Sequence, residues 1–341
     1  MTRRTLLASA ASSLAFSQSS PGVRLGIDLF SIRSQGWTPF EYLDYAARQG
    51  AKVVHFSEIR FIGSLDPANL KQVRAHAAQL GIQIEIGMRS ICPSSKMFDP
   101  KQGSAEEQLT RMITAAQIVG SPIVRAVLGS MEDRKPPGIE ARIADTVKVL
   151  RAVRSRVLDA GIKIAIENHA GDMQARELKS LIEAAGKDFV GVCLDSGNPL
   201  WTIEDPHLTL ETLYPYVLTS HVRDTAVWPA PDGGAAVQWV RMGDGNIGID
   251  EYVRRYAELC PGRALSLEII VTQPRIFAYN DPKFWDSYRQ TPAWEFARFA
   301  QLVQNGKPRP KQPPVPKELA AERERQDLEA SLEYTKKLIK I

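Results

Sequence analysis

Four apolar stretches from residue 162 onward end in or contain side chains that could bind a metal ion or move a proton. In chain order the stretches are IKIAIENH, FVGVCLDSGN, YVLTSHVRD and ALSLEII, and they supply Glu167, Asp195, His221 and Glu268. Three carboxylates in an apolar environment repel one another unless protons or a cation compensate their charge. Carboxylate oxygens with one imidazole suit Mn²⁺, Mg²⁺, Co²⁺ or Zn²⁺, and the lack of a thiolate in this set favours the harder ions. The four residues therefore predict a site for one divalent metal ion.

The chemistry expected of such a site is the formation of an enediolate. A metal ion that held a carbonyl and the neighbouring hydroxyl would lower the free energy of that species, while a carboxylate within hydrogen-bond reach removed the α-proton. Arg223 follows His221 by two residues, which places both on the same side of a strand, and it could stabilise the developing oxyanion. The alternatives are that the acids pair with arginines of the interior, and that Arg223 forms a rim salt bridge with Asp224 or Asp244.

Side chains from four separate stretches can meet if the stretches are neighbouring parallel strands. Apolar, β-branched runs alternate with segments of helical periodicity along the chain. The runs begin near residues 23, 51, 82, 121, 162, 189, 216 and 264. Eight strand-and-helix units of roughly 30 to 40 residues predict an α/β fold, a (β/α)₈ TIM barrel, whose strands all end at one mouth. Neither GxGxxG nor GxxxxGK[ST] follows the first run, which disfavours a nucleotide-binding open sheet.

Two terminal segments are expected to lie outside the barrel, which we assign to residues 21–306. Residues 307–341 read as a proline-rich connector and a C-terminal charged helix, whose thin apolar stripe would pack on the barrel or on a second subunit. Residues 1–20 contain paired arginines, a short apolar stretch and small residues, as in a twin-arginine export signal. A periplasmic location is therefore expected; the alternative is a frayed basic N-terminus in a cytoplasmic protein.

The composition excludes several classes of partner. A net charge of +4 in 341 residues is too small to predict a nucleic-acid-binding surface. No stretch reaches the ~18 consecutive apolar residues of a membrane-spanning helix, so stable membrane insertion is not expected. The three cysteines are far apart and form no CxxC pair, which argues against a disulfide framework. The expected partner is a small molecule, and the apolar stripe of the C-terminal helix also allows a homo-oligomer.

The series IAIENH, VGVCLDSGNP, TSHVRD, GDGNIGID and LSLEI resembles the xylose-isomerase-like TIM barrel superfamily, whose members are often labelled sugar phosphate isomerases or epimerases. The resemblance covers about residues 23–305. It implies that Glu167, Asp195, His221 and Glu268 bind one divalent metal ion, usually Mn²⁺. It also implies that Glu167 and Glu268 exchange a proton with the carbon next to the substrate carbonyl, from opposite faces. The function that it implies is that of a metal-dependent sugar isomerase or epimerase.

Other polar residues near the expected mouth are candidates for substrate binding. Ketose 3-epimerases of the superfamily commonly have a histidine three residues after the metal-binding aspartate, where this chain has Asn198, and that departure argues against ketose epimerisation in particular. His169 lies two residues after Glu167 and could recover some polar recognition, or it could cap the following helix. His55 and Glu58 end the second run, where family members often contact substrate; they could equally be structural residues of the rim.

Three other functions are alternatives to a sugar isomerase or epimerase. A lyase or hydratase could use the same metal and enolate chemistry on a 3-keto-glycoside, whose C2 proton is acidic. Export of the protein would also argue against a phosphorylated intracellular substrate. A non-catalytic carbohydrate-binding barrel would not require the metal site. A DNA-repair endonuclease of the superfamily binds three zinc ions through many histidines, and the five histidines and small net charge of this chain disfavour that function.

Overall fold

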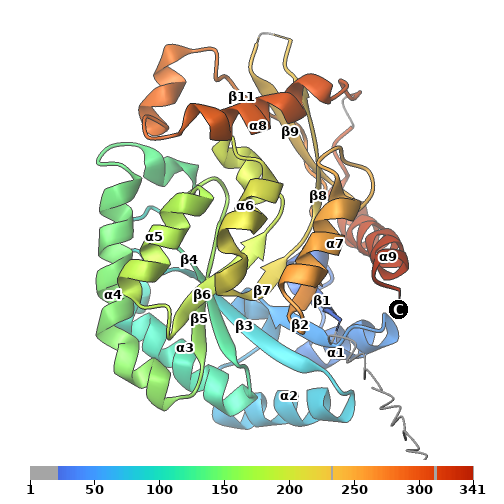
Figure 1. Cartoon of the computed structure of the whole chain (residues 1–341). Coiled ribbons are helices and arrows are strands. Elements are labelled where there is room, and N and C mark those ends of the chain that lie inside the picture. Colours follow the sequence, from blue (N-terminus) through green and yellow to red (C-terminus); the bar gives the residue numbers. More distant parts are fainter. Residues whose placement is uncertain (1–21, 232, 311–312, 341) are drawn as a thin grey trace, which may run out of the picture.

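A barrel of eight parallel strands forms the centre of the computed structural model, which describes residues 22–231, 233–310 and 313–340. The strands are β1 (Arg24–Asp28), β2 (Val53–Phe56), β3 (Gln83–Ser90), β4 (Ile123–Val127), β5 (Lys163–Glu167), β6 (Val190–Asp195), β7 (Val217–His221) and β10 (Ala264–Leu267). They pair in the order β10-β1-β2-β3-β4-β5-β6-β7, and a parallel bridge between Val222 and Leu267 joins the two ends of the sheet. The predicted (β/α)₈ TIM barrel is confirmed (Figure 1).

Helices alternate with the barrel strands and lie around them in Figure 1. They are α1 (Pro39–Arg48), α2 (Pro67–Gln79), α3 (Ala105–Val119), α4 (Ile139–Asp159), α5 (Ala175–Ala185), α6 (Pro206–Leu213), α7 (Ile249–Leu259) and α8 (Ala293–Asn305). Local sequence explains where they begin. Thr38 forms a capping box with Glu41 at the start of α1, and Ser104 forms one with Glu107 at the start of α3. Each box satisfies backbone N–H groups that the helix leaves free, so the loop after the preceding strand has a defined end.

The strand register brings several candidate residues to one level of the barrel. Asp195 at the end of β6 pairs with His221 at the end of β7, and Asp28 on β1 pairs with His55 on β2. Glu167 is the last residue of β5. All five side chains are buried, although branched apolar residues usually fill the interior of a TIM barrel. Because buried ionisable groups are costly unless they are paired, this level of the barrel must contain compensating charges.

A three-stranded antiparallel sheet, which the sequence pattern did not predict, adjoins the barrel mouth. Strands β8 (Asp224–Pro229) and β9 (Ala235–Val240) follow β7, and β11 (Arg275–Phe277) follows β10; they pair in the order β11-β9-β8. Helix α8 packs against β8, and both lie beyond the barrel strands in the upper part of Figure 1. Since β8 starts only three residues after His221, this sheet continues from the barrel directly beside the candidate site.

The C-terminal helix, α9 (Ala320–Ile339), packs on the barrel through contacts with α7 and with the short helix η1 (Leu29–Ile32). Leu328 and Leu332 of its apolar stripe are fully buried, and Asp327 Oδ1 accepts a hydrogen bond of 2.7 Å from Arg241 Nε. Of the two positions considered for this helix, the structure therefore shows the contact with the barrel of its own chain.

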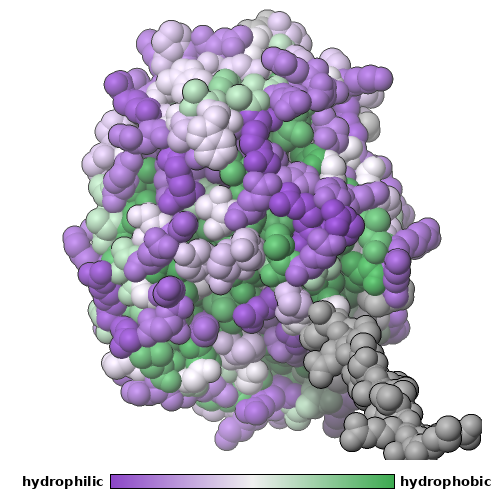
Figure 2. Space-filling model, in the orientation of Figure 1, coloured by the Kyte–Doolittle hydropathy of each residue, from purple (hydrophilic) through white to green (hydrophobic). Residues whose placement is uncertain are grey.

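In the part of the chain that the structure describes, no helix is both long and apolar enough to cross a membrane. Hydrophilic side chains cover much of the face in Figure 2, and hydrophobic side chains lie between them in scattered patches. The predicted export signal, residues 1–20, lies outside the described residues.

Candidate metal centre and active site

The four predicted metal ligands converge inside the mouth of the barrel. Glu167, Asp195, His221 and Glu268 are buried, and each offers one donor atom within 4.8 Å of the donors of the other three. His221 Nδ1 lies 3.0 Å from Glu167 Oε2 and 3.4 Å from Glu268 Oε2, yet it has no partner with hydrogen-bond geometry among the residues that the structure describes. A buried nitrogen without a partner, surrounded by three carboxylates, fits a divalent cation with oxygen and imidazole ligands.

Two arginines also lie in this cluster. Each of the three acids pairs with one of them, which is the alternative that the sequence left open. Arg125 on β4 contacts Glu167 Oε2 through Nε at 2.6 Å and through Nη2 at 2.5 Å. Arg223 contacts both Asp195 and Glu268 through Nη2. The two guanidinium groups compensate only part of the charge of the three carboxylates when all three are ionised.

The arginines determine the protonation of the carboxylates. Burial alone would raise the pKa of Glu268, but Arg223 and His221 outweigh it and lower that pKa to about 2. Burial also acts to raise the pKa of Glu167, but Arg125 and His221 hold it well below its usual range. Burial raises the pKa of Asp195 to about 6, against the opposing effect of Arg223. Both glutamates are therefore ionised at neutral pH, which is the state required to accept a proton.

The position of Arg223 is built into the surrounding structure. Its backbone N–H donates to Ser196 Oγ at 2.9 Å, and a Cβ atom on Gly197 would lie 2.6 Å from its Cγ and Cδ atoms. Its Nε and Nη1 atoms are buried, and neither has a hydrogen-bond partner in the described part of the chain. Asp224, which was considered as its salt-bridge partner, instead accepts hydrogen bonds from the backbone of Gly243 and Gly245. Arg223 thus keeps two donors free inside the site.

Aromatic rings support Arg223 from the antiparallel sheet. Its Cζ atom lies 4.3 Å from the ring centroid of Trp239 on β9. Trp239 stacks on Trp201, with ring centroids 4.2 Å apart and an interplanar angle of 7°. The Cζ atom of Arg275, on β11, lies 4.2 Å from the ring centroid of Trp201, which gives a second cation–π contact. Trp239 of the sheet and Trp201 of the short helix η5 (Asn198–Thr202) therefore form an aromatic wall beside the metal centre, and a cation over an indole face is a favourable contact.

Two of the predicted substrate-binding residues lie next to the centre. Asn198 donates from Nδ2 to Glu167 Oε1 at 3.2 Å and from its backbone N–H to Asp195 Oδ1 at 2.7 Å. Its Oδ1 atom has no hydrogen-bond partner within residues 22–231, 233–310 and 313–340. His169 Nδ1 lies 2.7 Å from the Gly129 carbonyl oxygen. A carbonyl can only accept, so the proton of the neutral ring is on Nδ1, and Nε2 is left as an acceptor. Their contacts with a substrate remain predictions.

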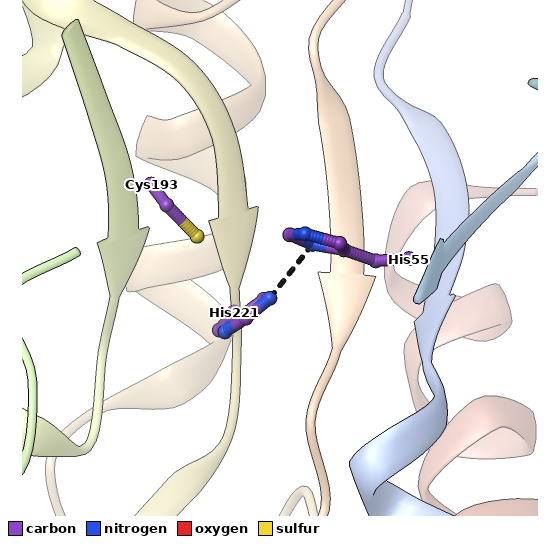
Figure 3. Close-up of side chains that lie close together, drawn as sticks. All are labelled: His55, Cys193 and His221. Carbon is purple, nitrogen blue, oxygen red and sulfur yellow. Dashed lines mark hydrogen bonds between the residues drawn. The ribbon is translucent and has the colours of Figure 1, made fainter. Parts of the chain in front are cut away.

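The two residues at the end of β2 lie in different surroundings. Glu58 is partly exposed, forms a 2.5 Å ion pair with Arg60 and borders a pocket of about 280 Å³ between the ends of β2 and β3 and helix α3. His55 is not on the rim. It is completely buried inside the barrel, where its Nδ1 atom lies 2.8 Å from His221 Nε2 (Figure 3).

Two residues of the cluster, Arg125 and Asp28, lie outside the set predicted from the sequence. Arg125 interrupts the apolar run SPIVRAVLG, and a charge in the middle of a buried strand was the signal that could have identified it. Asp28 ends the first run, VRLGID, in the same way that Asp195 ends the sixth. The rule that the carboxyl ends of barrel strands carry the chemistry therefore applied to β1 as well.

Comparison with known proteins finds a family and individual proteins whose sequences are similar to this chain. The sequence profile described as "Xylose isomerase-like TIM barrel" matches residues 43–287. A 3-oxo-isoapionate decarboxylase of Pectobacterium atrosepticum is 28% identical over 184 residues, which cover 54% of this chain and 60% of the decarboxylase, so the match spans less than two thirds of that protein. An uncharacterised protein of Escherichia coli, YihM, is 23% identical over 277 residues, which cover 78% of this chain and 73% of YihM.

Solved structures with low sequence identity share the fold. The D-psicose 3-epimerase of Clostridium cellulolyticum H10, solved with D-tagatose, is 15% identical with a TM-score of 0.58, over 82% of this chain and 96% of the epimerase. A xylose isomerase-like TIM barrel protein from Mycobacterium smegmatis, solved in complex with magnesium, is 14% identical with a TM-score of 0.55, over 82% of this chain and 98% of that protein.

Proposed function

Because the chain belongs to the xylose isomerase-like TIM barrel family, we propose that it is a divalent-metal-dependent enzyme that isomerises or epimerises a sugar or sugar derivative through an enediolate. The observation that carries this proposal is the buried group of Glu167, Asp195, His221 and Glu268, whose donor atoms all lie within 4.8 Å of one another. Mn²⁺ is the ion that we propose first, and Mg²⁺, Co²⁺ and Zn²⁺ also suit these ligands.

Each residue of the centre has a distinct task in this proposal. A divalent ion bound there would polarise the substrate carbonyl and the neighbouring hydroxyl. Glu167 and Glu268 are ionised, so either can remove the α-proton, and the residue that has taken it up can return it to the neighbouring carbon of the enediolate, which gives isomerisation. Epimerisation requires in addition that the second glutamate first takes up a proton, which it then delivers to the opposite face. The free Nε and Nη1 donors of Arg223 would bind the oxygen on which negative charge develops, while Asn198 orients Glu167 through the hydrogen bond to Oε1.

A second candidate function, loss of CO₂ from a 3-oxo sugar acid, uses the same type of intermediate. The bond between the α-carbon and the carboxylate would break, its electron pair would remain as an enolate, and a proton would then take the place of CO₂. The name of the Pectobacterium relative supports this candidate, and so do the two unpartnered donors of Arg223, since a guanidinium is a suitable partner for a carboxylate. Elimination from a 3-keto-glycoside would begin with the same proton removal by Glu167 or Glu268.

Metal content is the first test of the proposed site. We expect elemental analysis of the protein purified from its native compartment to find close to one divalent ion per chain. The Asp195→Ala and His221→Ala variants should lose it, because each removes a ligand from a set of four. Glu295→Ala is the matched control, since Glu295 is a buried carboxylate on α8 that pairs with Arg176 instead. Absence of metal from every preparation would contradict the proposal and would favour a non-catalytic carbohydrate-binding barrel.

The reaction class is decided by the products that the metal-loaded protein forms in deuterium oxide. Ketohexoses, 3-keto-glycosides and 3-oxo sugar acids would serve as probes, followed by NMR. Deuterium in a rearranged sugar supports isomerisation or epimerisation, release of CO₂ supports decarboxylation, and release of the C1 substituent supports elimination.

We also propose that residues 1–20 direct export to the periplasm. Their paired arginines support this proposal, since a twin-arginine signal is read by its arginines. In a bacterial host, we expect the unmodified chain in the periplasmic fraction and a variant with both Arg3→Lys and Arg4→Lys in the cytoplasm. Equal distribution of the two proteins between the fractions would argue against an export signal of this kind.

A further inference from the structure

His55 contacts the far side of the histidine that faces the three carboxylates. His221 presents Nδ1 to Glu167 and Glu268, and its other ring nitrogen, Nε2, lies 2.8 Å from His55 Nδ1. Figure 3 shows the two rings reaching toward each other from different strands. In the sheet order, β10 and β1 separate the strand of His221 from the strand of His55, so this hydrogen bond crosses the barrel interior. Both rings are completely buried, and water does not compete for the bond.

Metal binding would determine the direction of this hydrogen bond. A neutral imidazole has one nitrogen that donates and one that accepts, and a metal ion needs the lone pair of the nitrogen that binds it. If His221 Nδ1 is the metal ligand, the ring proton is on Nε2. His55 Nδ1 must then accept the hydrogen bond that His221 Nε2 donates, so the ring proton of His55 is on His55 Nε2.

A carboxylate on β1 favours the same arrangement. Asp28 Oδ2 lies 3.4 Å from His221 Nε2 and 4.0 Å from His55 Nδ1, and no described residue forms a hydrogen bond with it. The other oxygen, Oδ1, accepts from the backbone N–H of Phe30 at 2.9 Å, which holds the carboxyl group in place. An acceptor nearer to His221 than to His55 stabilises a proton on His221 Nε2.

We infer that His55 is a positioning residue for the metal centre: by accepting a hydrogen bond from His221 Nε2, it keeps the lone pair of His221 Nδ1 directed at the carboxylates. This inference rests on the proposed metal-dependent function. It replaces substrate contact as the role of His55, because the ring is completely buried inside the barrel and its Nδ1 atom lies 2.8 Å from His221 Nε2. Asp28 would support the same tautomer from β1.

The test uses two amide substitutions that differ in where they place the amide group. In His55→Asn the amide occupies the place of imidazole Nδ1 and can accept from His221 Nε2, whereas in His55→Gln it occupies the place of Nε2 and cannot. Titration calorimetry with Mn²⁺ on the full-length, metal-free protein should show a loss of about 10- to 100-fold in affinity for His55→Gln, as is typical when the partner of a metal-binding histidine is removed. His55→Asn should stay within a few-fold of the unchanged protein.

The outcomes separate this inference from the proposed function. His76→Gln is the control, because His76 lies on the outer helix α2 and pairs with Asp44 of α1. The affinity of this variant for Mn²⁺ should not change. If the unchanged protein binds Mn²⁺ and both His55 variants bind it equally well, the inference is overturned and the proposed function stands. If the unchanged protein does not bind Mn²⁺, both are overturned. Equal losses in the Asn and Gln variants would also overturn the inference, since they would report packing and not the acceptor at Nδ1.

Discussion

Replacing Glu268 with glutamine is expected to lower kcat by about 10²- to 10⁴-fold, the range usually lost with a general acid or base. Glutamine keeps the shape of the side chain and can still bind a cation through its carbonyl oxygen, but it cannot accept a proton. The pKa of Glu268, lowered to about 2 by Arg223 and His221 against the effect of burial, means that the carboxylate is ionised in the resting protein. The substitution therefore removes a base that is ready to react at neutral pH.

The measurement must distinguish lost proton transfer from lost metal. Turnover would be followed with saturating Mn²⁺ on the probe sugar that the unchanged protein converts, and elemental analysis would report the metal that the Glu268→Gln variant retains. Exchange of the substrate α-proton with deuterium oxide should fall together with turnover. Glu295→Gln makes the same chemical change in a buried carboxylate outside the centre and should leave both rates unaltered. Full turnover by a metal-loaded Glu268→Gln variant would disprove the role given to this residue.

The sequence predicted the barrel and the convergence of the four ligands because both depend on short-range patterns. Alternation of β-branched runs with helical segments predicts parallel strands, and the closure of eight such strands brings all of their carboxyl ends to one mouth. Glu167, Asp195 and His221 each end a run, so their meeting required no knowledge of side-chain geometry. Glu268 follows β10 directly and belongs to the same pattern.

Part of what the sequence did not predict depends on contacts between residues that are far apart in the chain. Arg125 and Glu167 are on adjacent strands and 42 residues apart, and His55 meets His221 over a separation of 166 residues. Nothing in the local pattern around His55 distinguishes a rim residue from an interior one, since both follow an apolar run. The antiparallel sheet was missed for another reason: strands β8 and β9 are buried throughout most of their length, so they lack the alternation of polar and apolar residues that reveals a half-exposed hairpin.

Replacing Arg223 with methionine should lower the stability of the metal-free protein and strengthen its binding of Mn²⁺. Methionine keeps much of the side-chain length against Gly197 and Trp239 but removes the charge that Asp195 and Glu268 share. Removing one partner of a buried ion pair leaves the other charge uncompensated, which typically costs about 3–5 kcal/mol. The metal-free variant should therefore unfold at a lower denaturant concentration, and the carboxylates without their arginine should bind Mn²⁺ more tightly than before.

Unfolding in urea with and without saturating Mn²⁺ measures both effects, because a ligand that binds only the folded protein adds to its free energy of unfolding. We expect Mn²⁺ to restore most of the stability that Arg223→Met loses, whereas Arg223→Lys, which keeps a cation, should lose less in the absence of metal. If the metal-free Arg223→Met variant is as stable as the unchanged protein, Arg223 does not serve as a counter-ion for the acids. Its free Nε and Nη1 donors would then point to the substrate as its main partner, and the effect of the substitution should appear in turnover alone.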